Sequence, residues 1–231
     1  MSNNASEKNG MASRVPSFLV LIGAALAAQL LGSYHARSYV IGNYFFLGWV
    51  VLRIVMPVAV LAALRVPFPR IGLGLPRFDR TTGKIMIAAA AVLGVAFIGI
   101  YFFRGYFSFY SNAFGGAGAG GAARFANFMI FTGSTLTGWE FLHRGFLLMG
   151  LSYLLAEREG VRADTAAKMA IGVVWVFEVV FHFIKPELEA LGLLAGSPFL
   201  SWLALRTKSI WPSFLIHLTV ELLFIVTLIL Q

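Results

Sequence analysis

The chain has 231 residues, of which 59% are hydrophobic and 12% are charged, and none is a cysteine. Because a soluble domain usually carries about 25% charged residues, this composition, with a mean hydropathy of +0.82, predicts a membrane protein with a single transmembrane domain. The net charge of +8 does not indicate a nucleic-acid partner, since the basic residues cluster in loops between apolar runs. The lack of cysteine excludes thiol nucleophiles, thiolate metal sites and disulfides.

In chain order, the sequence begins with a small polar segment, residues 1–15, which we expect to be a disordered cytoplasmic tail. Residues 16–231 then form the predicted transmembrane domain, in which apolar runs are long enough to cross a bilayer. The predicted fold is an all-α, polytopic transmembrane helical bundle of about seven spans, within a range of six to eight. The expected spans are residues 16–34, 39–64, 84–106, 125–156, 163–185, 188–206 and 210–230.

The loops between these spans predict the orientation of the bundle. With the N-terminus in the cytoplasm, twelve Lys and Arg residues fall in cytoplasmic segments and four in outer segments, as the positive-inside rule requires. One cytoplasmic segment, residues 67–77, is rich in Pro, Gly and Arg, and we interpret it as a surface connector. The compact size and the loops are typical of a prokaryotic protein, so we expect an integral protein of the cell (inner) membrane.

Ionisable residues within the predicted spans are the strongest functional signal. Each such residue near the middle of a span costs about 2.5–3.5 kcal/mol on insertion scales. Three spans nevertheless carry pairs four positions apart, which places both members on one helix face. Because each pair must face protein or water, the three spans are expected to surround a shared polar cavity. The pairs are Glu140 with Arg144, Glu178 with His182, and His217 with Glu221, and the second span holds Arg53 alone.

Several kinds of chemistry fit such a cavity. A buried carboxylate can act as a general base on water and later as a general acid, while histidines can stabilise the oxyanion that forms when water attacks an amide. One Glu and two His are therefore sufficient for peptide hydrolysis.

Three alternatives use the same or neighbouring residues. Glu140 and His143 are spaced like the Glu-x-x-His unit of di-metal carboxylate bundles, with further ligands available on the other spans, although only one such unit is present. Proton-coupled transport could use Glu and His relays, but no repeat typical of transporters is visible. Serine catalysis would need a nucleophile motif, and neither Ser134 nor Ser201 lies in one.

Three motifs then resemble those of one family, the CAAX protease and bacteriocin-processing (CPBP) intramembrane glutamic proteases. Residues 139–148, WEFLHRGFLL, resemble its first motif, Glu-Glu-x-x-x-Arg-Gly. Phe181-His182, followed by Lys185-Pro186 and by Glu187 to Glu189, resembles the second, whose invariant feature is a His late in a span. Residues 207–212, TKSIWP, lead to His217 and resemble the third, which continues as His-x-x-x-Asn. The resemblance covers residues 125–225, the expected CPBP-like core.

The resemblance implies a water-activating Glu, histidines that orient water and stabilise the oxyanion, and no required metal or other cofactor. Carried over by position, it assigns the second Glu of the first motif to Glu140, the Arg to Arg144, and the two His to His182 and His217. It implies a membrane-associated peptide or protein as substrate, within the lipid bilayer.

The sequence departs from the family pattern at three positions. Trp139 stands in place of the first Glu, Glu178 in place of an aromatic residue, and Glu221 in place of Asn. We interpret Glu140 as the leading base, held by Arg144, with Glu178 and Glu221 as alternative bases. Trp139 is interpreted as packing, Glu178 as either a site residue or the structural partner of Arg53, and His143 as a bond to a neighbouring helix or a site residue.

The sequence thus predicts an intramembrane endopeptidase that acts in protein processing or sorting. Two alternatives stay open, a non-catalytic bacteriocin-immunity or scaffold membrane protein, and a metal-dependent membrane hydrolase. One geometric conflict is visible: counted along straight helices at 1.5 Å per residue, His182 and His217 lie on opposite sides of the midplane. Either the fifth span continues through a kink at Pro186, or the helices tilt strongly.

Overall fold

The computed structural model describes residues 16–35, 50–101, 121–183 and 187–230. The predicted tail at residues 1–15 and most of the Gly-rich segment before residue 121 lie outside this part of the chain. Within it the fold is all-helical, with no strand, so the predicted fold class is correct at the level of secondary structure.

Seven helical rods match the seven predicted spans. Two rods contain π-helical segments, η1 and η4, which continue directly into α-helices, and a short 3-10 turn, η2 (Phe68–Arg70), lies in a connector. The rods are α1 (Ser17–His35), η1 (Val51–Val55) with α3 (Met56–Ala63), α4 (Arg80–Tyr101), α6 (Gly121–Glu140) with η4 (Phe141–Gly150) and α7 (Leu151–Glu157), α8 (Ala163–His182), α9 (Glu187–Thr207) and α10 (Trp211–Leu230).

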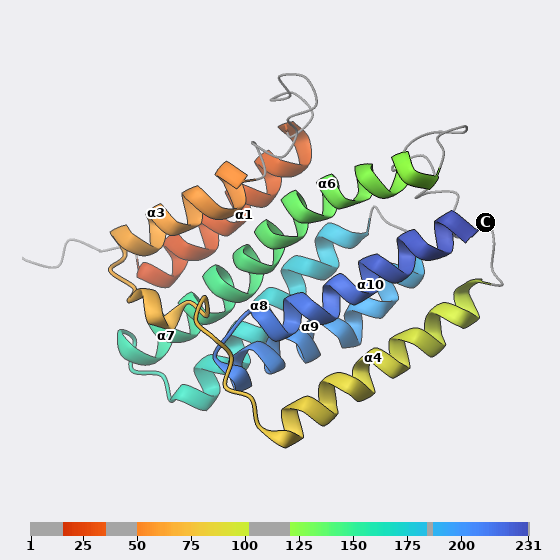
Figure 1. Ribbon diagram of the computed structural model, residues 1–231. Helices are drawn as coiled ribbons and strands as arrows, with labels where there is room; N and C mark the ends of the chain where they lie inside the picture. Colours follow the sequence, from red (N-terminus) through yellow and green to blue (C-terminus); the bar gives the residue numbers. More distant parts are fainter. Residues whose placement is uncertain (1–15, 36–49, 102–120, 184–186, 231) are drawn as a thin grey trace, which may run out of the picture.

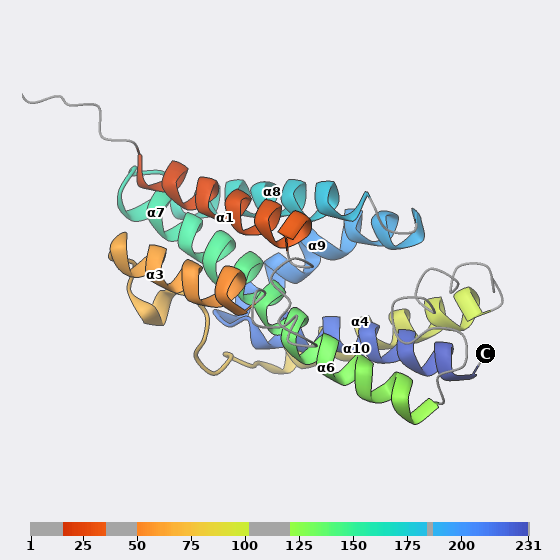
Figure 2. The same ribbon diagram turned by 90° about the horizontal axis from the view of Figure 1, so that it is seen from above.

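The longest rod, α6–η4–α7, crosses the centre of the bundle (Figure 1). Every residue of η4 is buried, because α1, α3, α8 and α9 pack around it. Viewed from above, α1 and α8 lie along one edge of the bundle, α3 lies on the opposite side of the rod, and α4 runs beside α10 (Figure 2). The stretch that carries the first motif is therefore the core of the fold.

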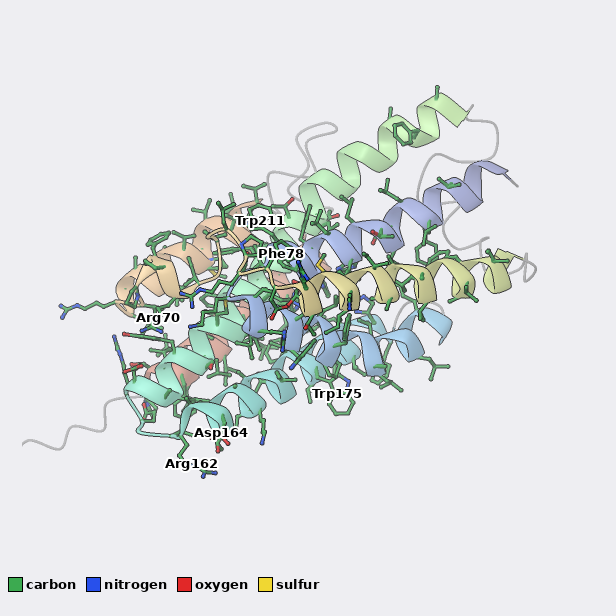
Figure 3. The ribbon with its side chains drawn as sticks, turned by 60° about the horizontal axis from the view of Figure 1, so that its bottom comes forward. Arg70, Phe78, Arg162, Asp164, Trp175 and Trp211 are labelled. Atoms are coloured by element: carbon green, nitrogen blue, oxygen red, sulfur yellow. The ribbon has the colours of Figure 1, made fainter. Side chains whose placement is uncertain are left out.

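The outer faces of the helices are apolar. Two segments, Arg80–Gly99 and Ala163–His182, are long and apolar enough to span a bilayer by length and composition alone. Their exposed residues include Ile87 and Val95 on α4 and Val176 on α8, and Trp175 projects from the outside of α8 (Figure 3). Apolar side chains on the outside of a bundle indicate a non-aqueous surrounding or a covering partner.

The start of α4 is tied to the end of α9. The Asp79 carboxylate accepts a 2.6 Å hydrogen bond from the Thr82 backbone N–H, as an N-cap residue does, and it forms a 3.0 Å ion pair with Arg206 of α9. The Thr82 backbone and hydroxyl groups, followed by Arg206, lower the pKa of Asp79 from its ordinary value. The carboxylate form, which caps the helix, is therefore favoured.

The connector at residues 67–77 is more than the surface link that the sequence predicted. The Ile210 N–H donates to the Gly72 carbonyl oxygen at 2.9 Å, the Ser209 hydroxyl donates to the Gly74 carbonyl at 2.8 Å, and the Trp211 indole N–H donates to the Leu73 carbonyl at 3.2 Å. This loop therefore fixes the turn between α9 and α10, which leads into the helix that carries His217.

Gly72 allows this docking because its φ of +77° lies in the left-handed region, and a Cβ there would overlap the Met149 Sδ atom. We expect Gly72→Ala to lower the free energy of unfolding by about 1–3 kcal/mol, since it adds backbone strain to overpacking. Gly74→Ala is the matched control, because nothing lies within 4 Å of its Cβ position. Thermal unfolding in detergent measures both. Equal midpoints for the two variants would contradict the packing described here.

Candidate active site

Glu140 lies where α6 changes into the π-helical segment η4. Such wide turns are rare and occur frequently at functional sites. Five residues later in chain order, Gly145 lets the connector approach the rod, because a Cβ there would lie 2.7 Å from the Phe141 ring and 3.0 Å from the Ile71 carbonyl oxygen. The Arg-Gly pair of the first motif thus places a charge in the interior and makes room for the neighbouring loop.

The central contact of the site joins Glu140 to His217. The His217 Nδ1 lies 2.7 Å from the Glu140 Oε1. The Glu140 side chain is fully buried, whereas His217 on α10 is 21% exposed. The second carboxylate oxygen of Glu140, Oε2, has no hydrogen-bond partner among the residues that the structure describes. One oxygen of Glu140 is thus held by a histidine, and the other is available to a small molecule such as water.

Arg144 contacts two carboxylates and lies closer to Glu178. Its guanidinium forms a bidentate pair with Glu178, in which Nη1 contacts Oε1 and Nη2 lies 2.9 Å from Oε2. Its Nη1 lies 3.5 Å from the Glu140 Oε1. Arg144 is near Glu140, as the spacing predicted, but its main partner is Glu178. Glu178 is therefore the partner of a buried arginine, and the arginine observed is Arg144.

Trp139 has polar contacts that its interpretation as packing did not include. Its indole N–H donates to the Glu178 Oε1 at 2.9 Å, and the rings of His143 and His182 lie 4.2 and 5.1 Å away. The Arg53 guanidinium lies over the same ring at 4.9 Å, in the geometry of a cation–π contact. Two of the three departures from the family pattern, Trp139 and Glu178, thus touch each other.

His182 ends α8 and faces two elements. Its Nδ1 lies 2.7 Å from the Glu178 backbone carbonyl oxygen, and its Nε2 lies 3.5 Å from the Glu189 Oε1 of α9. The helix α8 ends at His182, and the predicted kink at Pro186 lies outside the described residues. His182 reaches Trp139 while His217 reaches Glu140, so the two histidines meet neighbouring residues of one rod.

Two further carboxylates lie toward the surface. The Glu221 Oε1 lies 3.9 Å from the His217 Nε2, and its side chain is 25% exposed. Glu189, in the first turn of α9, has a side chain that is 17% exposed and lies 3.5 Å from His182. Sequence reasoning did not select Glu189. Its position in the first turn of the helix after His182 was the available signal.

His143 lies next to Trp139 rather than next to Glu140. Its Nδ1 donates to the Trp139 carbonyl oxygen at 2.8 Å, so its Nε2 accepts a 3.1 Å hydrogen bond from the Gln29 amide of α1. The Gln29 Oε1 in turn accepts from Arg53 at 3.4 Å. This buried layer includes Gln29, which the sequence analysis missed because an amide within an apolar run gives only a weak signal.

The other kinds of site have less geometric support. Among the described residues, no group of three or more His, Asp and Glu side chains is arranged to hold a metal ion. Ser201 is fully buried, and its hydroxyl has no hydrogen-bond partner in the described part of the chain, whereas a serine nucleophile needs an adjacent base.

The comparison with protein families matches this region. Residues 121–223 match the family model described as type II CAAX prenyl endopeptidase, Rce1-like. The matched segment contains α6, η4, α7, α8 and α9 and most of α10, and therefore all the predicted site residues. Neither a curated protein nor a solved structure matches the chain significantly.

Proposed function

Residues 121–223 belong to the CPBP family, of the Rce1-like type, and we propose that the protein is an intramembrane endopeptidase that hydrolyses a peptide bond with water activated by a glutamate. The observation that carries the proposal is the buried Glu140 carboxylate, with Oε1 at 2.7 Å from His217 and Oε2 without a partner in the described residues. A carboxylate that is held in a fixed orientation through one oxygen can accept a proton from water through the other.

The proposed mechanism uses Glu140 twice. Glu140 Oε2 accepts a proton from water as the oxygen attacks the scissile carbonyl carbon, and the carbonyl oxygen becomes an oxyanion. The protonated Glu140 then donates this proton to the leaving nitrogen as the C–N bond breaks. His217 orients Glu140 through Oε1, and His182 is the candidate donor to the oxyanion.

Arg144 and Glu178 have a supporting role in this proposal. Both oxygens of Glu178 are bound by Arg144, and one also accepts from Trp139, so Glu178 has little capacity left to bind water. Arg144 then offsets the charge of Glu140 from 3.5 Å. Glu221, in contact range of His217 and partly exposed, belongs to the opening of the site. Glu140 therefore remains the base, ahead of Glu178 and Glu221.

The setting of the proposed enzyme is a lipid bilayer. We propose a single transmembrane domain whose apolar outer faces on α4 and α8 contact lipid, with the N-terminus in the cytoplasm of a prokaryotic cell. The substrate is a membrane-associated peptide or protein. The family description names prenylated tails, whereas the sequence analysis favoured processing or sorting segments, so both classes are to be compared.

The test is a cleavage assay with protein purified in detergent. A farnesylated CAAX peptide, the same peptide without the lipid, and a hydrophobic C-terminal sorting segment are incubated with the wild type, and products are measured by mass spectrometry. Cleavage of at least one peptide, with a single new amine end, is expected. Activity that is lost to a chelator and restored by zinc would favour the metal-dependent hydrolase instead.

His217→Leu is expected to lower kcat by about 10²–10³-fold, because it removes the group that orients Glu140 and lines the reacting centre. The matched control is Thr219→Val on the same helix, since the Thr219 hydroxyl is exposed and bonds only its own helix at the Leu215 carbonyl. Comparable rates of peptide cleavage for the two variants would contradict the role of His217.

A further inference from the structure

Glu189 contacts His182 across the hairpin of α8 and α9, two helices that pack extensively on each other. Its Oε1 lies 3.5 Å from the His182 Nε2, and both side chains are largely buried. A carboxylate in the first turn of α9 is therefore directed at a histidine in the last turn of α8. Glu189 lies in the stretch that resembles the second family motif, but the sequence analysis assigned it no role in the site.

The hydrogen bonds of His182 show where its protons lie. Its Nδ1 is 2.7 Å from the Glu178 carbonyl oxygen, and because a carbonyl only accepts, Nδ1 carries a hydrogen. A neutral ring would then present a bare Nε2 to the Glu189 oxygen. Two bare acceptors repel each other, so this contact is attractive only when a proton lies between Nε2 and the carboxylate.

The charged groups that interact with Glu189 include a residue of α10. The charge of Glu221 opposes that of Glu189, and the His217 Nε2 lies 3.9 Å from the Glu221 Oε1. A proton on His182 lowers the energy of this acidic pair, since an imidazolium beside Glu189 balances one of its two charges. Contacts within 4 Å thus join Glu140, His217 and Glu221 in one group, and Glu189 and His182 in another.

We infer that Glu189 is a positioning residue that keeps His182 doubly protonated, so that its Nε2–H, which the Glu189 oxygen accepts only from 3.5 Å, can be shared with the oxygen of the scissile carbonyl as an oxyanion develops. This inference rests on the proposed peptidase function. The hydrogen stays on His182 throughout, because the proton that reaches the leaving nitrogen comes from Glu140. Without Glu189, a neutral His182 with hydrogen on Nδ1 would offer the oxyanion a lone pair instead of a donor.

The test compares Glu189→Gln and Glu189→Asp with the wild type. We expect Glu189→Gln to lower kcat by about 10²-fold, the effect of losing one oxyanion donor, with KM changed less than about twofold. The alkaline limb of its kcat–pH profile should move to lower pH, because the His182 imidazolium loses the Glu189 carboxylate that stabilises it. The other titratable groups near His182 are Glu178 on α8 and, beyond Glu189, Glu221 and His217 on α10. Glu189→Asp should recover part of the rate. Glu159→Gln, in an exposed turn, is the control and keeps wild-type kinetics.

A second measurement does not depend on turnover. In protein labelled with ¹⁵N-histidine, His182 should show two N–H signals in the wild type and one in Glu189→Gln at the same pH. Unchanged kcat, pH profile and His182 signals in Glu189→Gln, with Glu140→Gln inactive, would overturn this inference and leave the proposed function standing. An active Glu140→Gln protein would instead overturn the proposed function.

Discussion

Replacing Glu140 with Gln is expected to lower kcat for peptide cleavage by about 10³-fold or more, toward the upper range for loss of a general base. Gln has the same shape and can still accept the 2.7 Å hydrogen bond from His217, so the site keeps its packing while the group that removes the water proton is lost. The measurement is single-turnover cleavage of the peptide that the wild type processes fastest.

The control for this variant is Glu157→Gln. Glu157 ends the same helical rod and is exposed, so its replacement tests the loss of one carboxylate from the rod without touching the site, and its rate should equal that of the wild type. Residual cleavage by Glu140→Gln within tenfold of the wild type would show that another group is the base. Host protection from a bacteriocin by both Glu140→Gln and the wild type would favour the immunity alternative.

Much of the fold was predictable because apolar run lengths set the helices. The seven rods follow the seven predicted spans, and the fifth ends at His182, three residues before the predicted limit. The role of the segment at residues 67–77 was not predictable, since its backbone hydrogen bonds to Gly72 and Gly74 depend on a turn more than 130 residues later in the chain. The sequence of a loop alone does not indicate which distant turn it will contact.

The members of the candidate site stay a prediction, and the structure brings these residues together in pairs other than those suggested by their spacing. Spacing of four residues suggested that Glu140 pairs with Arg144, Glu178 with His182, and His217 with Glu221. In the structure the shortest contacts run between helices instead: Arg144 with Glu178, His217 with Glu140 and His182 with Glu189. Residues on one helix face share a direction, and whether they bond to each other or to a facing helix depends on packing that no single segment determines.

Two of the departures from the family pattern, Trp139 and Glu178, are in direct contact. Trp139 occupies the position of a Glu and Glu178 the position of an aromatic residue, and the indole of the first donates to the carboxylate of the second at 2.9 Å. In this chain one carboxylate and one aromatic ring are therefore in contact between two helices, with the two residue types exchanged relative to the motif pattern. Arg144 then keeps a carboxylate partner, which a buried guanidinium requires.

This exchange leads to a stability test. Glu178→Leu should lower the free energy of unfolding by about 3–5 kcal/mol, because removing one partner of a buried ion pair leaves the other charge uncompensated. Arg144→Met should have an effect of similar size, since it leaves Glu178 and Glu140 buried without their cation. Both are measured by thermal or SDS-induced unfolding in detergent, with Glu159→Gln, in an exposed turn, expected within about 0.5 kcal/mol of the wild type.

The double variant Arg144→Met/Glu178→Leu separates a charge effect from general loss of packing. If the bidentate pair is a unit, the double variant should be no less stable than Arg144→Met alone, because Glu178 no longer remains as a buried carboxylate without its cation. Some loss relative to the wild type persists, since Trp139 loses its acceptor. Additive effects of the two substitutions would contradict the pairing, and would mean that Glu178 is stabilised mainly by groups other than Arg144.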